Sequence, residues 1–488
     1  MSHPESAATS LALEDTVELP CGKRLPNRLV KSAMAEIMSI NTLPNERLNR
    51  LYKTWSGGRF GMIISGNVQV APNHLGLPFD VAIPLPSKRP NPTARERYAS
   101  WAASMNTKDP SQQPLRIMQL NHPGRQSMRV FTGRSPFTPA LAPSAVPMTA
   151  GKGRIGEFMG NAVWGIPRAM TNQDIEEVVQ QFLRGAKLAQ ESGWDGVQLH
   201  ASHGYLLAQF LSPHTNLRTD EYGGTPRKRI ALLLEIASRI RAEYPLSSGF
   251  VLGVKLNASD YIRGGLTEED ALDNVRWLTE HGGFDFIEIS GGSYEAPEFL
   301  STKSSTSTRE AFFAEFSRRA YEMLSDRSAT SELSAPRPLV LLTGGLRTRV
   351  GMRQALADPV ADLVGVGRPA AVDPHLAAKI LDPKLQDDHA TIPSYDPSQG
   401  TLVLRWLFAG LTLFGPSLDV LYHNLLMHDL ARVRLDSTSA CFDGPTVRER
   451  LVSFPRLVKQ ICIDPFVSPR TQRLVVWFVV GFALVRAF

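Results

Sequence analysis

Residues 171–205 read TNQDIEEVVQQFLRGAKLAQESGWDGVQLHASHGY and contain one complete unit of an alternating helix and strand pattern. Apolar residues recur every three or four positions over 171–192, which predicts an amphipathic helix. Thr171 followed by Asp174 matches a capping box at its start. The apolar run 196–199 is typical of a parallel strand that is buried on both faces. Two histidines and a tyrosine follow at once, so polar chemistry is expected where this strand ends.

The same unit recurs along most of the chain. Helical patterns occupy 227–244 and 309–324, and Thr267 followed by Asp270 is a second capping box. Roughly eight strand and helix units in ~350 residues favour an α/β fold of the (β/α)8 TIM barrel type over an open doubly wound sheet. The chemistry of such a barrel collects at the carboxyl ends of its strands. The predicted strands are 29–34, 62–70, 115–120, 196–199, 251–256, 286–290, 339–342 and 363–366.

Composition and charge exclude several classes of protein. The chain has 488 residues, of which 43% are hydrophobic and 20% charged, so a disordered or fibrous protein is excluded. Its three distant cysteines (Cys21, Cys441 and Cys462) form neither a disulfide framework nor a cysteine-ligated iron–sulfur site. The net charge of +6 has no basic stripe, so no nucleic-acid partner is expected. The start lacks the pattern of a secretory signal, and a cytoplasmic location is expected.

The pattern divides the chain into four parts. We predict a flexible segment over 1–15, a barrel over 16–385, a linker over 386–400 and a C-terminal extension over 401–488. Long loops at 121–170 and 291–307 are expected to select the substrate. The apolar run 474–485 is flanked by arginines and has two interpretations, a membrane attachment or a helix packed on the barrel or on another subunit. The oligomeric state stays open.

The residues after strand 196–199 suit carbonyl chemistry. His200 and His203 can donate hydrogen bonds to a carbonyl oxygen and polarise it, and Tyr205 is a phenol suited to giving a proton. A metal site is disfavoured because no carboxylate or cysteine stands at zinc-site spacing. A purely structural role, in which both histidines cap a strand, remains the alternative.

Glycines mark a candidate phosphate site after the last two predicted strands. Gly344 and Gly345 follow one strand, and Gly367 and Arg368 follow the other, where TIM barrels often bind phosphate. Ordinary tight turns are the alternative for the glycines. Residues 151–156 match G-x-G-x-x-G, but they follow a loop rather than a strand and do not lead into an evident helix. We therefore expect no dinucleotide site there.

Across about residues 16–385 the sequence resembles the old yellow enzyme family of FMN-dependent NAD(P)H oxidoreductases, most closely its fungal NADH:flavin oxidoreductase branch. The matching motifs stand at successive strand ends, and the block over 200–224 is the most specific of them. The motifs are LPNRLVKSAM (25–34), GMIISGNVQV (61–70), MQLNHPGRQS (118–127), HASHGY (200–205), SPHTNLRTDEYGG (212–224), GVKLNASDY (253–261), ISGG (289–292), LLTGG (341–345) and ADLVGVGRP (361–369).

The resemblance implies which residues bind FMN and substrate. Gln119 would pair with the amide-like edge of the flavin ring, and Lys255 would stabilise the negative charge of reduced flavin. His200, His203 and Ile37 would contact the substrate. Alanine at 35, isoleucine at 37 and lysine at 255 depart from residues common in the family. The implied FMN-binding residues are Ser32, Ala33, Met34, Ala35, Gly66, Gln119, Lys255, Gly344, Gly345, Gly367 and Arg368.

The implied activity is a ping-pong reduction, with a possible place in secondary metabolism. NAD(P)H reduces FMN, and a small α,β-unsaturated carbonyl compound then accepts hydride in the same pocket while Tyr205 supplies the proton. Three other functions remain open: an NADH oxidase or quinone diaphorase, a flavin-dependent double-bond isomerase, and a non-enzymatic carrier of flavin or another ligand.

Overall fold

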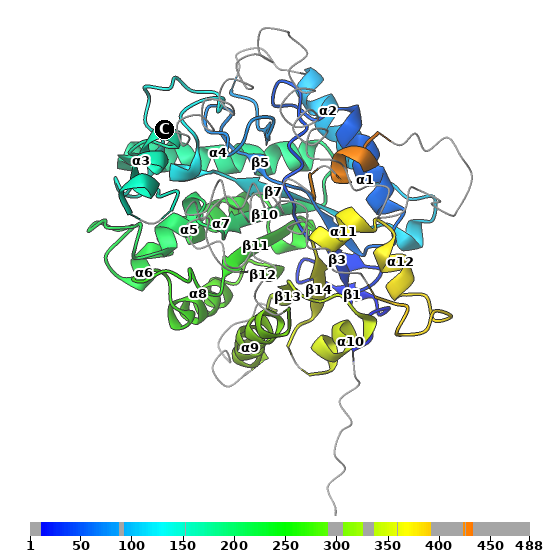
Figure 1. Ribbon diagram of the computed structural model, residues 1–488. Helices are drawn as coiled ribbons and strands as arrows, with labels where there is room; N and C mark the ends of the chain where they lie inside the picture. The colour runs from blue at the N-terminus through cyan, green and yellow to red at the C-terminus, as the bar shows by residue number, and fades with distance from the viewer. Residues whose placement is uncertain are drawn as a thin grey trace, which may run out of the picture.

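The described residues form a closed barrel of eight parallel strands. The computed structural model describes residues 11–86, 92–151, 153–290, 306–325, 336–358, 360–391, 423–424 and 426–432. The strands pair in chain order, and the pairing of β10 with β7 completes the ring, with helices around it (Figure 1). The predicted (β/α)8 fold is confirmed. The barrel strands are β3 (Leu29–Lys31), β4 (Met62–Ile64), β7 (Leu115–Asn121), β10 (Gly196–Ala201), β11 (Val251–Asn257), β12 (Phe286–Ser290), β13 (Leu339–Thr343) and β14 (Leu363–Val366).

Two predicted strands differ from the observed ones in ways that affect the site. The run 62–70 is two strands, β4 and β5 (Val68–Gln69), because the chain leaves the barrel wall between them. β5 pairs with the end of β7 and with β6 (Val81–Ala82) instead of continuing the ring. β10 extends two residues beyond the prediction, so His200 lies within the strand, opposite Lys255 of β11.

The amphipathic segments form the outer layer of the barrel. Both predicted capping boxes are present, at Thr171 before α4 and at Thr267 before α8. The segment 227–244 is two helices, α6 and α7, which meet at Ile230. The helices are α1 (Glu46–Ser56), α2 (Pro92–Ala103), α4 (Asn172–Glu191), α5 (Leu206–Leu211), α6 (Pro226–Arg229), α7 (Ala231–Glu243), α8 (Glu268–His281), α9 (Thr306–Ser325), α10 (Arg349–Ala357), α11 (Arg368–Val372) and α12 (Leu376–Ile380).

Apolar side chains fill two regions, one between strands and helices and one inside the barrel. The inner cluster includes Ile117, Phe286 and Leu341 and is covered by a hairpin of β1 (Val17–Glu18) and β2 (Arg24–Leu25). In this hairpin the amide of Cys21 donates to Asp285, the residue before β12, at 2.7 Å. The hairpin therefore closes the amino ends of the strands, and the carboxyl ends remain available for a site.

The long loop after β7 has structure of its own. It contains a short parallel pair, β8 (Leu141–Ala142) with β9 (Arg168–Ala169), and the helix α3 (Gly153–Val163). Contrary to the sequence analysis, the glycine pattern 151–156 does open a helix. No strand leads directly into it, and these residues do not line the central cavity described below.

The boundaries of the barrel unit are wider than expected. Leu13 is buried and its carbonyl accepts from the amide of Arg28 at 2.9 Å, so residues 11–15 pack on the barrel rather than forming part of a flexible segment. Ala390, in the predicted linker, is also buried. Residues 1–10 and 392–400 lie outside the described residues, as do Cys441 and Cys462.

One piece of the C-terminal extension is described, residues 423–424 and 426–432, which we call the post-barrel segment. It lies beside α1 (orange in Figure 1) and contributes Leu426, Met427, Leu430 and Ala431 to the outer core. Within the described residues, no helix has both the length and the apolar character needed to cross a membrane. The run 474–485 and most of the loop 291–307 lie outside the described residues.

Candidate functional site

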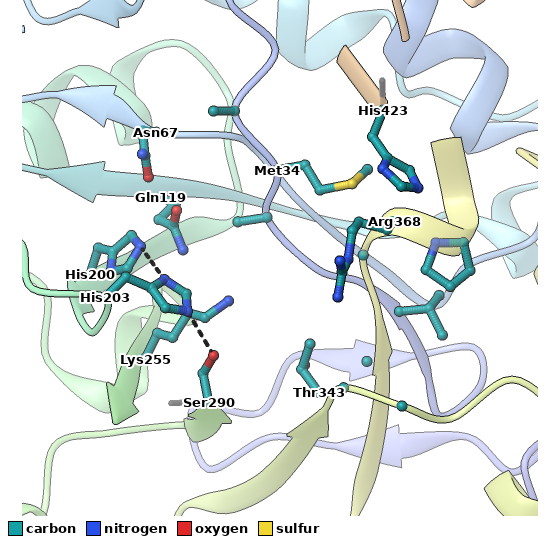
Figure 2. Close-up of a pocket in the computed structure, with 18 of the residues that line it drawn as sticks. Met34, Asn67, Gln119, His200, His203, Lys255, Ser290, Thr343, Arg368 and His423 are labelled. Carbon is teal, nitrogen blue, oxygen red and sulfur yellow. Dashed lines mark hydrogen bonds between the residues drawn. The ribbon is translucent and has the colours of Figure 1, made fainter. Parts of the chain in front are cut away.

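A cavity opens at the carboxyl ends of the barrel strands. Two sets of polar residues face it in Figure 2, one containing His200, His203, Gln119 and Lys255, the other containing Arg368 and His423. Its lining residues are Ala33, Met34, Ala35, Asn67, Gln119, His200, His203, Tyr205, Lys255, Ser290, Thr343, Gly344, Gly345, Leu346, Arg347, Gly365, Val366, Gly367, Arg368, Pro369, His423, Asn424 and Met427.

The histidine pair is part of a hydrogen-bonded chain. Ser202 donates its amide to Nδ1 of His200 at 3.3 Å, which assigns the proton of His200 to Nε2. This Nε2 lies 3.4 Å from Nδ1 of His203, and Nε2 of His203 lies 2.9 Å from Oγ of Ser290 (Figure 2). The contact between the rings is long for a hydrogen bond. A ligand oxygen could therefore replace it at little cost.

Burial keeps both imidazoles neutral. It lowers the pKa of His200 and of His203 well below the usual value, and the charge of Lys255 adds to the effect in each case. Neutral rings still carry one N–H each, so the pair suits hydrogen-bond donation to a carbonyl oxygen without adding charge to the site. His203 has a left-handed backbone (φ 57°), a conformation that few non-glycine residues adopt.

Tyr205 lies next to this pair on the same wall. Its ring meets that of His200 edge-on, with 4.8 Å between ring centres, and its phenol oxygen accepts a hydrogen bond from Asn67 at 3.2 Å. Tyr205 is also the residue before α5, so the start of that helix fixes its backbone. The phenol is thus held at the cavity by groups from two different strand ends.

A buried polar chain supports Gln119 and Lys255. Nζ of Lys255 lies 3.0 Å from Oε1 of Glu288, which is fully buried on the neighbouring strand β12. Gln198 donates to the other oxygen of Glu288, and Gln119 donates to Gln198, each at 2.7 Å. This chain fixes the orientation of the Gln119 amide and balances the charge of Lys255.

The opposite part of the cavity fits a phosphate. Gly344 and Gly345 adopt φ values of 128° and 78°, which residues other than glycine rarely adopt. With Gly367 they bring bare backbone to the cavity, and Arg368 adds a fork of charged donors. Among the described lining residues there is no carboxylate. Glycine backbone and guanidinium therefore form a donor set suited to the phosphate of FMN.

Three sequence-predicted residues lie outside the cavity wall. Ser32 is buried behind it, with its hydroxyl 2.9 Å from that of Thr343. Gly66 donates its amide to Glu36 at 2.9 Å, and a side chain at this position would collide with the same carboxylate. Ile37 is half-buried and does not line the cavity. Ser32 and Gly66 support the wall, and the substrate contact of Ile37 stays a prediction.

Several lining residues were not singled out from the sequence. Asn67, Ser290 and Thr343 stand inside the motifs GMIISGNVQV, ISGG and LLTGG, and their position at strand ends was the available signal. His423, Asn424 and Met427 come from the post-barrel segment. No local pattern in that segment indicates that it reaches the cavity.

Comparison with known proteins identifies the family. The model of the NADH:flavin oxidoreductase / NADH oxidase family matches residues 21–386. The NADH-dependent flavin oxidoreductase iccE of Talaromyces variabilis is 39% identical over 380 residues, 76% of this chain and 86% of that protein. The NADH-dependent flavin oxidoreductase iliE of Neonectria sp. (strain DH2) is also 39% identical, over 75% of this chain, which spans only 47% of that relative's length.

Solved structures share the fold at low sequence identity. The old yellow enzyme homologue from Zymomonas mobilis is 21% identical with a TM-score of 0.58, over 79% of this chain and all of that one. Morphinone reductase in complex with tetrahydroNAD is 20% identical with the same TM-score, over 79% of this chain and 93% of that one. On the family match and the sequence relatives, the chain belongs to the NADH:flavin oxidoreductase / NADH oxidase family, the old yellow enzyme family of FMN- and nicotinamide-dependent oxidoreductases.

Proposed function

We propose that the protein reduces the activated C=C bond of small α,β-unsaturated carbonyl compounds, with NADH as the hydride source. The observation that carries this proposal is the cluster of His200, His203 and Tyr205 on one wall of the cavity. Two neutral N–H donors and a phenol are what such a reduction requires of the protein. The names of the fungal relatives, NADH-dependent flavin oxidoreductases, favour NADH over NADPH.

The histidines and the tyrosine would act on different atoms of the substrate, the carbonyl oxygen and the α-carbon. FMN, when bound, supplies the hydride chemistry, passing two electrons from the nicotinamide to the alkene. His200 and His203 would hold the carbonyl oxygen and draw electron density from the β-carbon. Tyr205 would give its proton to the α-carbon, and the amide of Asn67 stabilises the phenolate oxygen that remains.

Separate measurement of the two half-reactions tests the histidine assignment. In His200→Ala we expect oxidation of the reduced enzyme by an enone such as cyclohexenone to slow by ~10²–10³, the usual effect of losing an oxyanion-type donor. Anaerobic reduction by NADH should change much less. In Tyr205→Phe the enone step should slow as well, since the proton must then come from water. Anaerobic stopped-flow absorbance of the flavin measures both steps.

The controls separate this function from its alternatives. His203→Asn is the variant matched to His200→Ala at the second histidine, because asparagine keeps an N–H donor and tolerates the left-handed backbone of residue 203. The flavin content of every variant must equal that of the parent. If His200→Ala leaves the rate of the enone step unchanged, His200 does not hold the carbonyl oxygen. If oxygen or a quinone oxidises the reduced parent enzyme much faster than enones do, the oxidase or diaphorase function replaces this one.

A further inference from the structure

The backbone of His203 adopts a conformation that requires support from outside its own turn. His203 has φ 57° and the next residue, Gly204, has φ 72°, so two consecutive residues are left-handed. Glycine adopts this conformation freely, whereas a residue with a Cβ atom does so at a cost in free energy. Such a conformation persists where the surrounding structure determines it. The contacts of residue 203 therefore decide whether it is kept.

Asn257, at the carboxyl end of β11, holds the amide of His203. The side-chain oxygen of Asn257 accepts from this amide at 3.0 Å and also accepts from the hydroxyl of Ser202. Nδ2 of Asn257 donates to Oδ1 of Asp260 at 3.0 Å, which assigns the nitrogen to Asp260 and the oxygen to the turn. Because Asn257 is buried and bonded through both atoms of its amide, its oxygen is fixed against the amide of His203.

Gln126 holds the carbonyl of the same residue. It is the last residue of the short 3₁₀ helix Gly124–Gln126, which follows β7, and it is also buried. Its Nε2 donates to the carbonyl of His203 at 2.8 Å. The amide and the carbonyl of His203 belong to the two peptide planes that meet at its Cα atom. With both planes held by side chains from other strand ends, φ and ψ of His203 are determined.

The position of the imidazole follows from this backbone. Asn257 is paired in the sheet with Ser290 of β12, and Oγ of Ser290 lies 2.9 Å from Nε2 of His203. Neighbouring strand ends therefore contact both the backbone and the ring of His203. Figure 2 shows this ring between His200 and Ser290. Because the direction of a side chain depends on φ and ψ, a relaxed backbone at residue 203 would move the ring away from this place.

We propose that Asn257 and Gln126 are positioning residues, which keep His203 left-handed and thereby hold its imidazole where it can meet a carbonyl oxygen. The inference rests on the proposed function, because that function assigns the oxygen to the histidine pair. Neither Asn257 nor Gln126 is among the described lining residues of the cavity. Each therefore acts on the reaction through His203.

A double-mutant cycle on the full-length, FMN-loaded protein tests this. The measured quantity is the second-order rate constant for anaerobic oxidation of the reduced flavin by cyclohexenone. Asn257→Leu, which removes the acceptor, should lower it about 10- to 100-fold, because a displaced imidazole no longer meets the oxygen. In a His203→Ala background the same substitution should change it by less than about threefold, since no imidazole is left to displace.

Gln126→Met is the second variant of the cycle, and it lies outside the barrel strands. It removes the donor to the carbonyl of His203 with a side chain of similar length. Its effect should also be present with His203 and absent in His203→Ala. Cyclohexanone has the carbonyl oxygen but no C=C bond, so its affinity for the oxidised protein is a readout independent of turnover. By equilibrium dialysis, its dissociation constant should rise roughly two- to tenfold in both variants.

Asn216→Leu is the matched control. Asn216 is likewise a buried asparagine that holds two backbone groups, the carbonyls of Phe210 and Tyr222, each at 2.7 Å. It is not among the described lining residues of the cavity. This variant should leave the rate constant and the affinity for cyclohexanone unchanged.

The inference is overturned if Asn257→Leu and Gln126→Met react like the parent while His203→Ala is slow, and the proposed function then stands. It is also overturned if either substitution slows the reaction by the same factor with and without His203, or if both variants lose FMN, because the two residues are then structural. A parent-like rate in His203→Ala contradicts the role of His203 in the proposed function, and this inference falls with it.

Discussion

Lys255, which lines the cavity, forms a buried ion pair with Glu288 of the neighbouring strand β12. Glu288 is fully buried, and its Oε1 lies 3.0 Å from Nζ of Lys255. In Glu288→Gln the pocket loses a negative charge, and reduced flavin, which is anionic, becomes easier to form. We expect the midpoint potential of bound FMN to rise by tens of millivolts, where about 30 mV corresponds to ~1.4 kcal/mol for two electrons. Equilibration with redox dyes measures this.

Asp285→Asn is the matched control for that potential. Asp285 is also fully buried and paired, with Arg241 at 2.7 Å, but it lies at the amino end of β12, away from the cavity. Both substitutions should destabilise the fold, because each removes the carboxylate that is paired with a largely buried cation, Lys255 or Arg241. Only Glu288→Gln should shift the potential. If the midpoint potential shifts equally in both variants, Glu288 affects it through the stability of the fold and not through its charge near the flavin.

The capping box of α8 is a local element that the sequence predicted and the structure contains. The hydroxyl of Thr267 accepts from the amide of Asp270 at 3.1 Å, and the carboxylate of Asp270 accepts from Thr267 in return. Asp270 also accepts from Arg229 of α6 at 3.3 Å. In Thr267→Ala we expect the free energy of unfolding to fall by about 1 kcal/mol. The midpoint of urea unfolding of the FMN-bound protein measures this loss.

Thr267→Ser is the control for the cap, because serine keeps the hydroxyl that accepts the amide. Its unfolding midpoint should stay close to that of the parent. If serine and alanine lower the midpoint equally, the methyl group of Thr267 is what matters, and the hydrogen bond contributes little.

Attachment of the post-barrel segment to the barrel is expected to depend on pH. Burial, followed by the charge of Arg47, lowers the pKa of His428 to about 4, with Arg432 also adding positive charge nearby. The attached form therefore holds neutral His428, whereas a detached imidazole takes up a proton below about pH 6.5. Attachment is at full strength above pH 6.5 and should weaken by roughly 2 kcal/mol at pH 5. Hydrogen exchange of peptides covering 423–432, corrected for intrinsic rates, measures this loss of protection.

His428→Gln provides the control, since glutamine can accept from Arg47 and donate to the carbonyl of Glu36 without titrating. Its protection should be the same at pH 7 and pH 5. Equal acid sensitivity in the parent and in His428→Gln would assign the effect to another group.

The apolar runs and capping boxes of the sequence predicted the barrel, because each strand and helix depends mainly on residues close to it in the chain. The strands 286–290 and 363–366 and both capping boxes agree with the structure, since short apolar runs and helix starts depend on neighbours in the chain. The split of 62–70 into β4 and β5 was missed because both halves are apolar. Only pairing with β7 at two separate places distinguishes them.

The site was predictable only in part, for the same reason. Gln119, Lys255, His200 and Arg368 line the cavity because parallel strands bring their carboxyl ends to one mouth. Ile37 does not line the cavity, and its substrate contact stays a prediction; it lies in the loop after β3 with a left-handed backbone (φ 53°), which local sequence patterns do not predict. The hydrogen bonds from His200 through His203 to Ser290 also depend on two separate strand ends, those of β10 and β12.

The amino-acid order alone indicated that alternating apolar strands and amphipathic helices would close into a barrel with polar residues at the carboxyl ends of its strands, and only its resemblance to a flavoprotein family implied FMN. Periodicity and strand-end motifs involve residues that are only a few positions apart, so they can be recognised in the sequence without the fold. Only the tertiary structure placed Asn424 and Met427, some 40 residues beyond the barrel, in the wall of that mouth. That placement follows from contacts of Arg47, Arg50 and Glu36 with a distant segment, and no local pattern encodes contacts across such a separation.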